Sequence, residues 1–353
     1  MFPSSPSAPR AAPAARPIVL IAALVLLLAA CSGGSAASTL PGASTTAVAT
    51  ATPQPTTAPT PSSAAAPDFP TTLIDDEDAA VTIPAEPQKI VSLTPASTEI
   101  LFALGAGPRV IATTEFDDYP PAAVALPDVA TYTTVDVEKI VGLEADLVIA
   151  GGNFFNPPEA ITRLRALGVP VLVVYAPDLA GALEDIELIG AAVGLPDEAT
   201  AMTATMQADI DAVSAATSGL DKPRTFYELD VSTGPIYTVA DGSVYVEMIE
   251  LAGGDPITTG STTDFAIPLE KLIAADPELI LLGDAAYKVT AEQVKARSGW
   301  NVMTAVKTDA IRPVDDIIIT RPGPRLVQGL RELALAIHPD LVLPSAAPIP
   351  PVP

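Results

Sequence analysis

The sequence VEKIVGLEADLVIAGG at residues 137–152 is followed 132 positions later by LEKLIAADPELILLGD at residues 269–284. Each copy begins with a short amphipathic stretch that carries a Glu-Lys pair, breaks, and ends in four or five consecutive apolar residues. This is the pattern of a helix that leads into a buried parallel strand. Four of the sixteen aligned pairs are identical and most others are conservative. The repetition predicts two related α/β lobes.

A second, looser similarity supports a duplication. The segments STEILFALGAG at residues 97–107 and VYVEMIELAGG at residues 244–254 are both amphipathic and both end in glycines. Glycine after a helix is typical of a left-handed cap, a conformation that is costly for residues with a Cβ atom. Each of these predicted helices precedes its Glu-Lys unit, so the order of elements is the same in both halves.

Strand and helix patterns alternate from about residue 71 to residue 341, a length sufficient for two domains. We expect a first lobe at residues 71–178 and a second at 219–341, each a parallel sheet covered by helices. The predicted strands are 89–93, 109–114, 169–175, 225–229 and 311–314, and further helices are predicted at 158–167, 291–297 and 322–337. Residues 179–218 are helical in pattern except near 194–196, which is too long for a crossover within one lobe. We expect this segment to join the lobes.

The N-terminus resembles a bacterial lipoprotein signal. Arg10 and Arg16 precede an apolar run at residues 18–30 that ends in Leu-Ala-Ala before Cys31. The run is as long as the apolar part of a signal peptide and shorter than the roughly 20 residues of a membrane-spanning helix. The resemblance implies cleavage after residue 30 and a lipid on Cys31, with a plain secretory signal as the alternative. Cys31 is the only cysteine, so it cannot form an internal disulfide.

The segment after Cys31 has the composition of a flexible linker. Residues 31–70 consist almost wholly of Ala, Ser, Thr, Pro and Gly, and Asp68 is their single charge. Such a segment has too little apolar surface to fold, so we expect a disordered tether that holds the folded part beside the membrane. Residues 342–353 are Pro-rich and are expected to form an unstructured tail.

Composition excludes several classes of partner and chemistry. Removal of residues 1–30 leaves 16 basic and 42 acidic residues, a net charge of −26. Nucleic acid is therefore excluded as a partner, and an anionic lipid surface would repel the folded part, so the anchor has to supply membrane attachment. His338 is the only histidine, which argues against an ordinary zinc or copper centre and a Cys-His dyad. A hydrolase with paired carboxylates remains formally open.

The segment KIVSLTPASTEILFALGAGPRVIATTEFDDYPPAA at residues 89–123 resembles the opening of periplasmic ferric-siderophore and cobalamin-binding proteins of ABC importers. The two Glu-Lys units, GWNVMTAVK at residues 299–307 and RPGPRLVQGLRELA at residues 321–334 follow in the order of that family. The resemblance implies the class III periplasmic-binding-protein fold, with two Rossmann-like lobes joined by a long helix and moving little on binding. It also implies a monomeric, membrane-anchored extracytoplasmic receptor, not an enzyme, that delivers its ligand to an ABC permease with ATPase subunits.

Glu138 and Glu270 begin the two repeated units and match the carboxylates that the family presents to arginines of the permease. One acid on each lobe would give a two-point electrostatic docking contact. The alternative is structural, because acids in the first turn of a helix are stabilised by the helix dipole.

The ligand is expected between the lobes, at the carboxyl ends of the strands. The candidate contacts are Phe116, Tyr132, Asn153, Phe154, Phe155, Tyr227, Tyr237, Phe265 and Arg321. Phe116, Tyr132 and Phe265 fall at or near family positions that contact the ligand, although a loop aromatic can instead cover its own core. A guanidinium such as Arg321 can bind carbonyl, hydroxamate or carboxylate oxygens. Arg325 is expected to pair with a structural acid, and Trp300 is expected in the core.

The expected ligand is a metal complex that arrives already chelated, either a ferric siderophore or a corrinoid such as cobalamin. Such a ligand requires no metal site and no cofactor from the protein, in agreement with the single His and single Cys. The presence of one Trp slightly favours a siderophore, because cobalamin-binding relatives carry more tryptophans. Haem is a third option and would require a Tyr ligand. From another class, a lipid-anchored interaction or adhesion protein that reuses the fold is the alternative.

Overall fold

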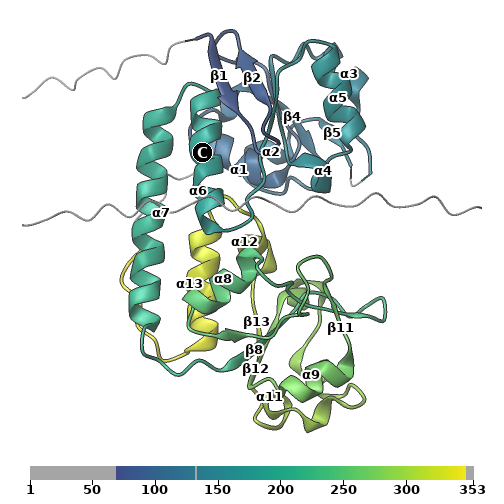
Figure 1. The fold of residues 1–353 in the computed structure, drawn as a ribbon, viewed down its shortest axis with the longest axis vertical. Coiled ribbons are helices and arrows are strands. Elements are labelled where there is room, and N and C mark those ends of the chain that lie inside the picture. The colour runs from purple at the N-terminus through teal and green to yellow at the C-terminus, as the bar shows by residue number, and fades with distance from the viewer. Residues whose placement is uncertain (1–68, 132, 347–353) are drawn as a thin grey trace, which may run out of the picture. The chain divides into compact units, whose positions relative to one another are not determined.

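The computed structural model describes residues 69–131 and 133–346, with the side chains of Asn153 and Phe154 excepted. The predicted signal peptide, Cys31, most of the tether, Tyr132 and the end of the tail lie outside the described residues. The described residues belong to one compact unit, which is drawn in colour in Figure 1.

The first sheet has five parallel strands in the order β5-β4-β3-β6-β7. Its strands are β3 (Ile90–Ser92), β4 (Val110–Thr114), β5 (Asp128–Ala130), β6 (Leu147–Ala150) and β7 (Val171–Val173). The helices between them are α1 (Pro95–Ala103), α2 (Pro121–Val124), α3 (Val137–Gly142), α4 (Gly152–Phe155) and α5 (Pro158–Ala166), with the 3₁₀ turn η1 (Gly107–Arg109). The observed elements lie within two residues of the strands and helix predicted for this lobe.

The second sheet has four parallel strands in the order β10-β8-β12-β13. Its strands are β8 (Arg224–Glu228), β10 (Asp255–Pro256), β12 (Leu279–Leu282) and β13 (Ile311–Pro313), and β9 (Ile236–Tyr237) pairs separately with β11 (Ala266–Ile267). The helices are α8 (Val244–Leu251), α9 (Leu269–Ala275), α10 (Ala291–Lys295), α11 (Thr304–Lys307), α12 (Asp316–Thr320) and α13 (Leu326–Ile337), with η2 (Gly283–Tyr287) and η3 (Trp300–Val302). The predicted α/β class with two parallel sheets is confirmed.

The two repeated units occupy equivalent places in the two sheets. Helix α3 leads into β6, which lies beside the first strand β3, and helix α9 leads into β12, which lies beside the first strand β8. Between helix and strand, the aligned residues Glu144 and Asp276 both have a left-handed backbone, with φ of 58° and 44°. The agreement extends to a conformation that side chains with a Cβ rarely adopt, which supports the interpretation of the repeat as a structural duplication.

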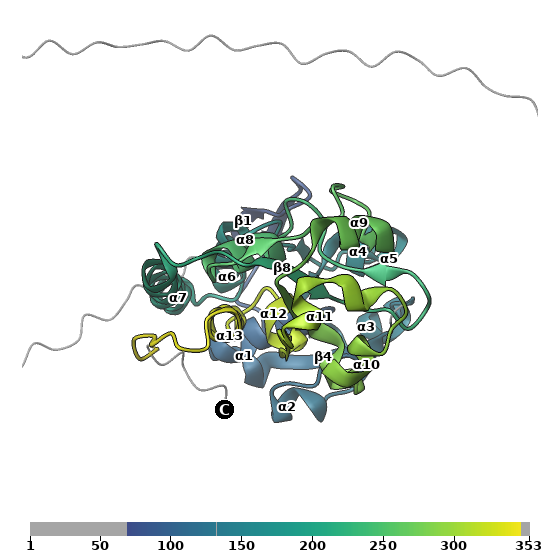
Figure 2. The same cartoon turned by 90° about the horizontal axis from the view of Figure 1, so that it is seen from below.

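The long helical segment consists of two helices, α6 (Leu179–Ala192) and α7 (Pro196–Thr217). The chain reverses between them at Gly194, whose φ is 79°, which is the break that the sequence predicted. Helix α7 lies against α6 and α13, and it leads the chain towards β8 (Figure 1). Viewed from below in Figure 2, α6, α7, α8 and α13 gather on one side, whereas α3 and α9 lie on the other.

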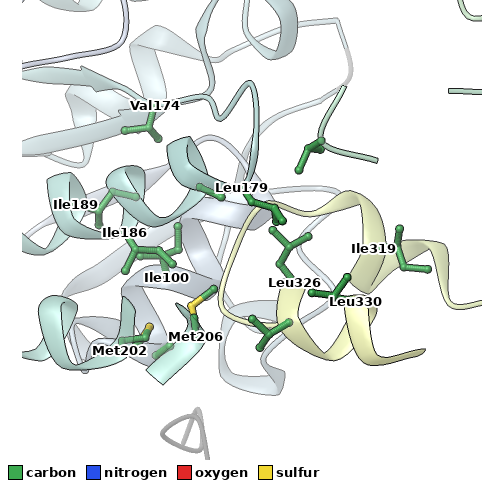
Figure 3. Packing of buried hydrophobic residues seen from close by; sticks show 14 of the residues in the cluster. Ile100, Val174, Leu179, Ile186, Ile189, Met202, Met206, Ile319, Leu326 and Leu330 are labelled. Carbon is green, nitrogen blue, oxygen red and sulfur yellow. The ribbon is translucent and has the colours of Figure 1, made fainter. Parts of the chain in front are cut away.

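One cluster of buried apolar side chains connects both sheets through these helices. It contains Leu147 and Ile149 of β6, Leu279 and Leu281 of β12, and side chains from α1, α6, α7, α8 and α13. Figure 3 shows part of this packing, with Ile100, Ile186, Met206 and Leu330 from four different helices. We call it the shared core.

The alternate residues of the same strands point away from the shared core. Val148 and Ala150 belong to a separate cluster on the outer face of the first sheet, and Ile280 and Leu282 belong to another on the outer face of the second. Each central strand is therefore buried on both faces, as expected of a parallel strand with period-two alternation.

The start of the last helix and an N-terminal hairpin differ from the sequence expectation. The last helix begins at Leu326 instead of residue 322, because Pro322 and Pro324 lie in a loop that separates it from α12. A hairpin of β1 (Thr71–Ile74) and β2 (Ala80–Ile83) also precedes the first sheet. Its turn hydrogen-bonds to the backbone of the edge strand β7. The Asp76 N–H donates to the Val173 carbonyl (3.1 Å), and the Asp75 carboxylate accepts from the Val173 N–H (3.2 Å).

Candidate functional site

The carboxyl ends of the two sheets meet at Arg321. Its Nη1 donates to Glu99 Oε1 (3.2 Å) and contacts the Asp118 carboxylate, and its Nη2 lies 3.4 Å from the Phe116 carbonyl oxygen. Phe116 and Asp118 follow β4 of the first sheet, whereas Arg321 follows β13 and α12 of the second. Since ligands of open α/β sheets bind outside the carboxyl ends of the strands, this junction marks the candidate site.

Glu99 of α1 is the centre of the junction. It is 1% exposed and accepts two further hydrogen bonds from Arg325, at 2.8 Å from Nε and 2.6 Å from Nη2. This hydrogen-bonded carboxylate raises the pKa of Arg325 above its usual value. The Arg325 guanidinium also lies 4.3 Å from the centre of the Tyr119 ring, within range of a cation–π contact. The prediction that Arg325 pairs with a structural acid is confirmed.

The loop after β4 is held by Asp117. Its Oδ2 accepts hydrogen bonds from Thr114 N–H (2.8 Å) and the Thr114 hydroxyl (2.6 Å). The side chain is buried, and this burial raises the pKa of Asp117 in spite of the hydrogen bonds. The loop turns at this point and leaves the Phe116 ring 45% exposed.

Aromatic side chains follow four of the parallel strands and are exposed. Phe116 follows β4 and Phe155 (55% exposed) follows β6, as the sequence predicted. Sequence reasoning missed Tyr175, which follows β7 and is 46% exposed, and Tyr287, which follows β12 and is 83% exposed. Both could have been found by the rule that identified the other two, because each comes within five residues of the end of a predicted apolar strand.

The other predicted aromatics have different environments. Tyr227 is completely buried in the shared core, where its hydroxyl donates to Asp316 Oδ1 (2.8 Å), so the expected ligand contact at Tyr227 is corrected. Strand alternation explains why Tyr227 is buried and does not reach the candidate site. Successive side chains of a strand point to opposite faces of the sheet, and Tyr227 points to the inner face. Tyr237 and Phe265 are half-buried around the β9-β11 pair.

Two predicted residues are placed only by their backbone. Asn153 and Phe154 lie in α4, directly after β6, and their side chains are not described. Tyr132 is outside the described residues. Trp300 is 3% exposed and packs edge-on against Phe226, with 6.2 Å between ring centres, which confirms the expectation of a core residue.

The second sheet carries a buried charged group at its carboxyl end that sequence reasoning did not identify. Glu228, the last residue of β8, is fully buried and accepts a hydrogen bond from Arg297 Nη2 (2.8 Å), and the Arg297 guanidinium lies 4.6 Å from the centre of the Trp300 ring. Asp284 follows β12 nearby. Burial and the adjacent Glu228 raise the pKa of Asp284 to about 7.

A hollow of about 510 Å³ lies beside this group. It is lined by the loop after β8, the start of α9, and the side chains of Arg297 and Trp300. Three or more His, Cys, Asp or Glu side chains do not converge as metal ligands anywhere in residues 69–131 and 133–346. The same part of the chain contains no helix with the length and apolarity of a membrane span.

Glu138 and Glu270 both lie in the first turn of the helix of their repeated unit, and both are exposed. Arg163 Nη2 lies 3.4 Å from Glu138 Oε1, in a pair whose side chains are 60% and 85% exposed. Among the described side chains, no ion pair involves Glu270. The positions are compatible with both alternatives left open by the sequence, docking and interaction with the helix dipole.

Comparisons with known proteins cover most of the folded part. The family model described as periplasmic binding protein matches residues 90–317. An uncharacterized ABC transporter substrate-binding lipoprotein of Bacillus subtilis is 34% identical over 77% of this chain and 87% of its own length. A cobalamin-binding protein of Halobacterium salinarum is 30% identical over 76% of this chain and 74% of its own. The crystal structure of the periplasmic vitamin B12 binding protein of Vibrio cholerae matches with a TM-score of 0.63 and 27% identity, over 71% of this chain and 97% of that one.

Proposed function

The chain belongs to the periplasmic binding protein family, and we propose that it captures an already chelated metal complex, a corrinoid or a ferric siderophore, between the carboxyl ends of its two sheets. It is the extracytoplasmic substrate-binding protein of an ABC transporter and acts by binding, not catalysis. The partner is therefore a permease, to which the ligand is delivered.

The observation that carries the proposal is the set of exposed aromatic rings at the strand ends. Phe116, Phe155 and Tyr175 come from the first sheet and Tyr287 from the second. Rings in these places offer flat apolar surfaces to a large ligand, and such surfaces with a few polar groups are typical of small-molecule sites. A ligand that brings its own metal needs shape and apolar contact from the protein more than it needs metal ligands.

Arg321 supplies a polar contact at the same junction. Glu99 is already held by two hydrogen bonds from Arg325, so the third, from Arg321, is the one that can be given up at least cost. Asp118, the other partner of Arg321, has a side chain that is 52% exposed. We propose that Arg321 turns from Asp118 towards an oxygen atom of the bound ligand, a charge-assisted hydrogen bond.

The similarity to proteins named for cobalamin supports a corrinoid as the ligand. The scarcity of tryptophan does not oppose it, because exposed Tyr and Phe rings stand at the strand ends and Trp300 is in the core. We further propose that Cys31 carries the lipid after cleavage of residues 1–30, that the protein is a monomer, and that Glu138 and Glu270 contact the permease.

The direct test is a binding titration of the purified mature protein, followed by intrinsic fluorescence and calorimetry. The ligands are cyanocobalamin, a ferric trihydroxamate, a ferric catecholate and haem. We expect saturation at a 1:1 ratio by a corrinoid or a ferric siderophore, and a loss of affinity of at least tenfold in the variant Phe155→Ala/Tyr287→Ala.

Leu167→Ala serves as the matched control for this variant. Leu167 is 55% exposed, like Phe155, but it precedes β7 at the amino end of the sheet. Its removal should leave affinity unchanged. Failure of all four ligands to bind would refute the proposal and favour an interaction or adhesion protein, whereas saturation by haem alone would assign the site to haem.

A further inference from the structure

The charged side chains at the carboxyl ends of the strands are mostly acidic. Seven acids lie within four residues of the end of a strand, namely Glu115, Asp117 and Asp118 after β4, Asp230 after β8, Asp284 after β12, and Asp315 and Asp316 after β13. Glu99 and Glu228 are buried beside them. Nine carboxyl groups thus lie at or next to the carboxyl ends of the strands, where the site is proposed above, and this inference rests on that proposal.

The basic side chains in the same region are fewer and mostly neutralised. Arg321 and Arg325 are bound to Glu99, and Arg297 is bound to Glu228. Lys288, six residues after β12, is exposed and is counted with them, and no ion pair is seen for it in the described part of the chain. Four cations against nine carboxyl groups leave a net charge of −5 with every group ionised, or −4 with Asp284 protonated.

Two of these acids also have a carboxyl oxygen without a hydrogen-bond donor among the described residues. Asp117 is 7% exposed and its Oδ1 has no donor among the described residues, and Asp284 is 3% exposed with no donor for either oxygen. Buried acceptors without donors are unfavourable, and the cost falls when a ligand brings N–H groups or positive charge close to them. These acceptors are a second observation, independent of the net charge, that favours a ligand rich in donors.

We propose that the site selects chelates that are neutral or positively charged, such as amide-bearing corrinoids and neutral or cationic ferric trihydroxamates, and rejects chelates with net negative charge. The rings of Phe155 and Tyr287 bind the apolar body of any such chelate, so the rings alone do not discriminate by charge. The acids do so, because like charges brought together in a partly dry site repel. Ferric catecholates, ferric citrate and haem, with its two propionates, are the classes that the site disfavours.

The test compares ligands that share a scaffold and differ in charge. For corrinoids these are aquocobalamin, cyanocobalamin and a cyanocobalamin monocarboxylate, and for trihydroxamates they are ferrioxamine B and its N-succinyl derivative. Affinities are measured by calorimetry in about 20 mM and about 300 mM NaCl, a range over which charge interactions become strongly screened. We expect at least tenfold weaker binding of the anionic member in low salt, and a smaller difference in high salt.

Variants identify the residues responsible. The triple variant Glu115→Gln/Asp230→Asn/Asp315→Asn removes three acids at the strand ends and should strengthen binding of the anionic member at least tenfold, with less than a threefold change for the neutral one. The matched control Asp211→Asn/Asp221→Asn/Asp340→Asn removes three exposed acids on α7, before β8 and after α13, and changes net charge equally. The control should leave the preference unchanged.

The outcomes separate this inference from the proposed function. If no chelate of any charge binds, the proposed function fails. If a chelate binds and its anionic form binds as tightly as its neutral form, or if added salt weakens the anionic form, the function stands and the charge selection is refuted. An equal effect of the two triple variants would also refute it, because long-range net charge would then account for the preference.

Discussion

The repeated units α3-β6 and α9-β12 share their order of elements and a left-handed residue before the strand, but they have different surroundings. In the first lobe the left-handed residue Glu144 is exposed and pairs on the surface with Lys89, whereas in the second the equivalent Asp276 accepts hydrogen bonds from Thr304 N–H (2.7 Å) and its hydroxyl (2.9 Å). At the strand ends, Glu228 next to β12 occupies the place that Leu93 holds next to β6. The two units therefore share a frame, while the polar interactions around it are specific to each lobe.

The largest expected effect comes from making the second lobe resemble the first. Arg297→Leu removes the partner of the fully buried Glu228 and should lower the free energy of unfolding by about 3–5 kcal/mol, as when one member of a buried pair is lost. The double variant Glu228→Leu/Arg297→Leu should recover most of that loss, because position 228 then carries an apolar residue, as the equivalent position Leu93 does in the first lobe. Urea unfolding measures both. If the double variant is as unstable as the single one, the charged pair is required for the stability of the second lobe.

The pH dependence of stability should distinguish a buried acid on the connecting helix α6 from a buried acid of the second lobe. Burial and the nearby Asp76 and Glu184 raise the pKa of Asp185 on α6 to about 8, and the pKa of Asp284 is about 7. A folded-state pKa above the unfolded value of 3.8 means that the folded protein holds its proton more tightly, so stability falls as pH rises from about 4 to the folded pKa and then levels off.

We therefore expect Asp185→Asn and Asp284→Asn to become more stable than the unchanged protein as pH rises, by roughly 1–2 kcal/mol at pH 9 after allowance for screening. The gain should level off near pH 7 for Asp284→Asn and near pH 8 for Asp185→Asn. Thermal unfolding from pH 4 to pH 9 gives the two profiles. A gain of the same size at pH 4 as at pH 9 would show that proton binding is not its cause.

Substitution of the left-handed residue by glycine should change the free energy of unfolding in opposite directions in the two repeats. Glu144→Gly relieves a left-handed backbone and loses a surface ion pair of little value, for a gain of about 0.5 kcal/mol. Asp276→Gly relieves the same strain but leaves Thr304 without its two hydrogen bonds, for a net loss of about 1 kcal/mol. Chemical denaturation of the two variants is sufficient, and equal signs would contradict the comparison.

The smallest effect on stability is expected at the two proposed docking acids. Glu138→Ala and Glu270→Ala remove exposed side chains and should each change the free energy of unfolding by less than about 0.5 kcal/mol. The double variant should keep its ligand affinity but lose most of its stimulation of the permease ATPase in proteoliposomes. Glu159→Ala, another exposed first-turn acid on α5, is the control. Full stimulation by the double variant would leave the helix dipole as the role of both acids.

The sequence predicted the elements that carry a clear periodicity. The switch from an amphipathic helix to an apolar run identified both repeats, and the glycines that end the segment 97–107 correctly placed the end of α1 near Ala103. Strands of two or three residues such as β5, β9, β10 and β11 were not predicted, because so few residues show no alternation. Their pairing depends on neighbours distant in the sequence.

The candidate site could be predicted only in part, for a similar reason. Position after a strand identified Phe116 and Phe155, but it also selected Tyr227, whose orientation depends on which face of β8 meets the shared core. The link between Glu99 and Arg325 spans more than 200 positions, and no local pattern indicates it. The group of Glu228, Arg297 and Asp284 likewise depends on strand register that only the structure reveals.

The shared core has a consequence for delivery. One apolar layer joins both sheets, so a hinge motion that separated them would expose this layer to water. The ligand-free and the ligand-bound protein should therefore have nearly the same conformation. An unloaded molecule would then compete with a loaded one for the same transporter. Uptake at a fixed supply of ligand should therefore pass through a maximum as the amount of this protein in the cell is increased.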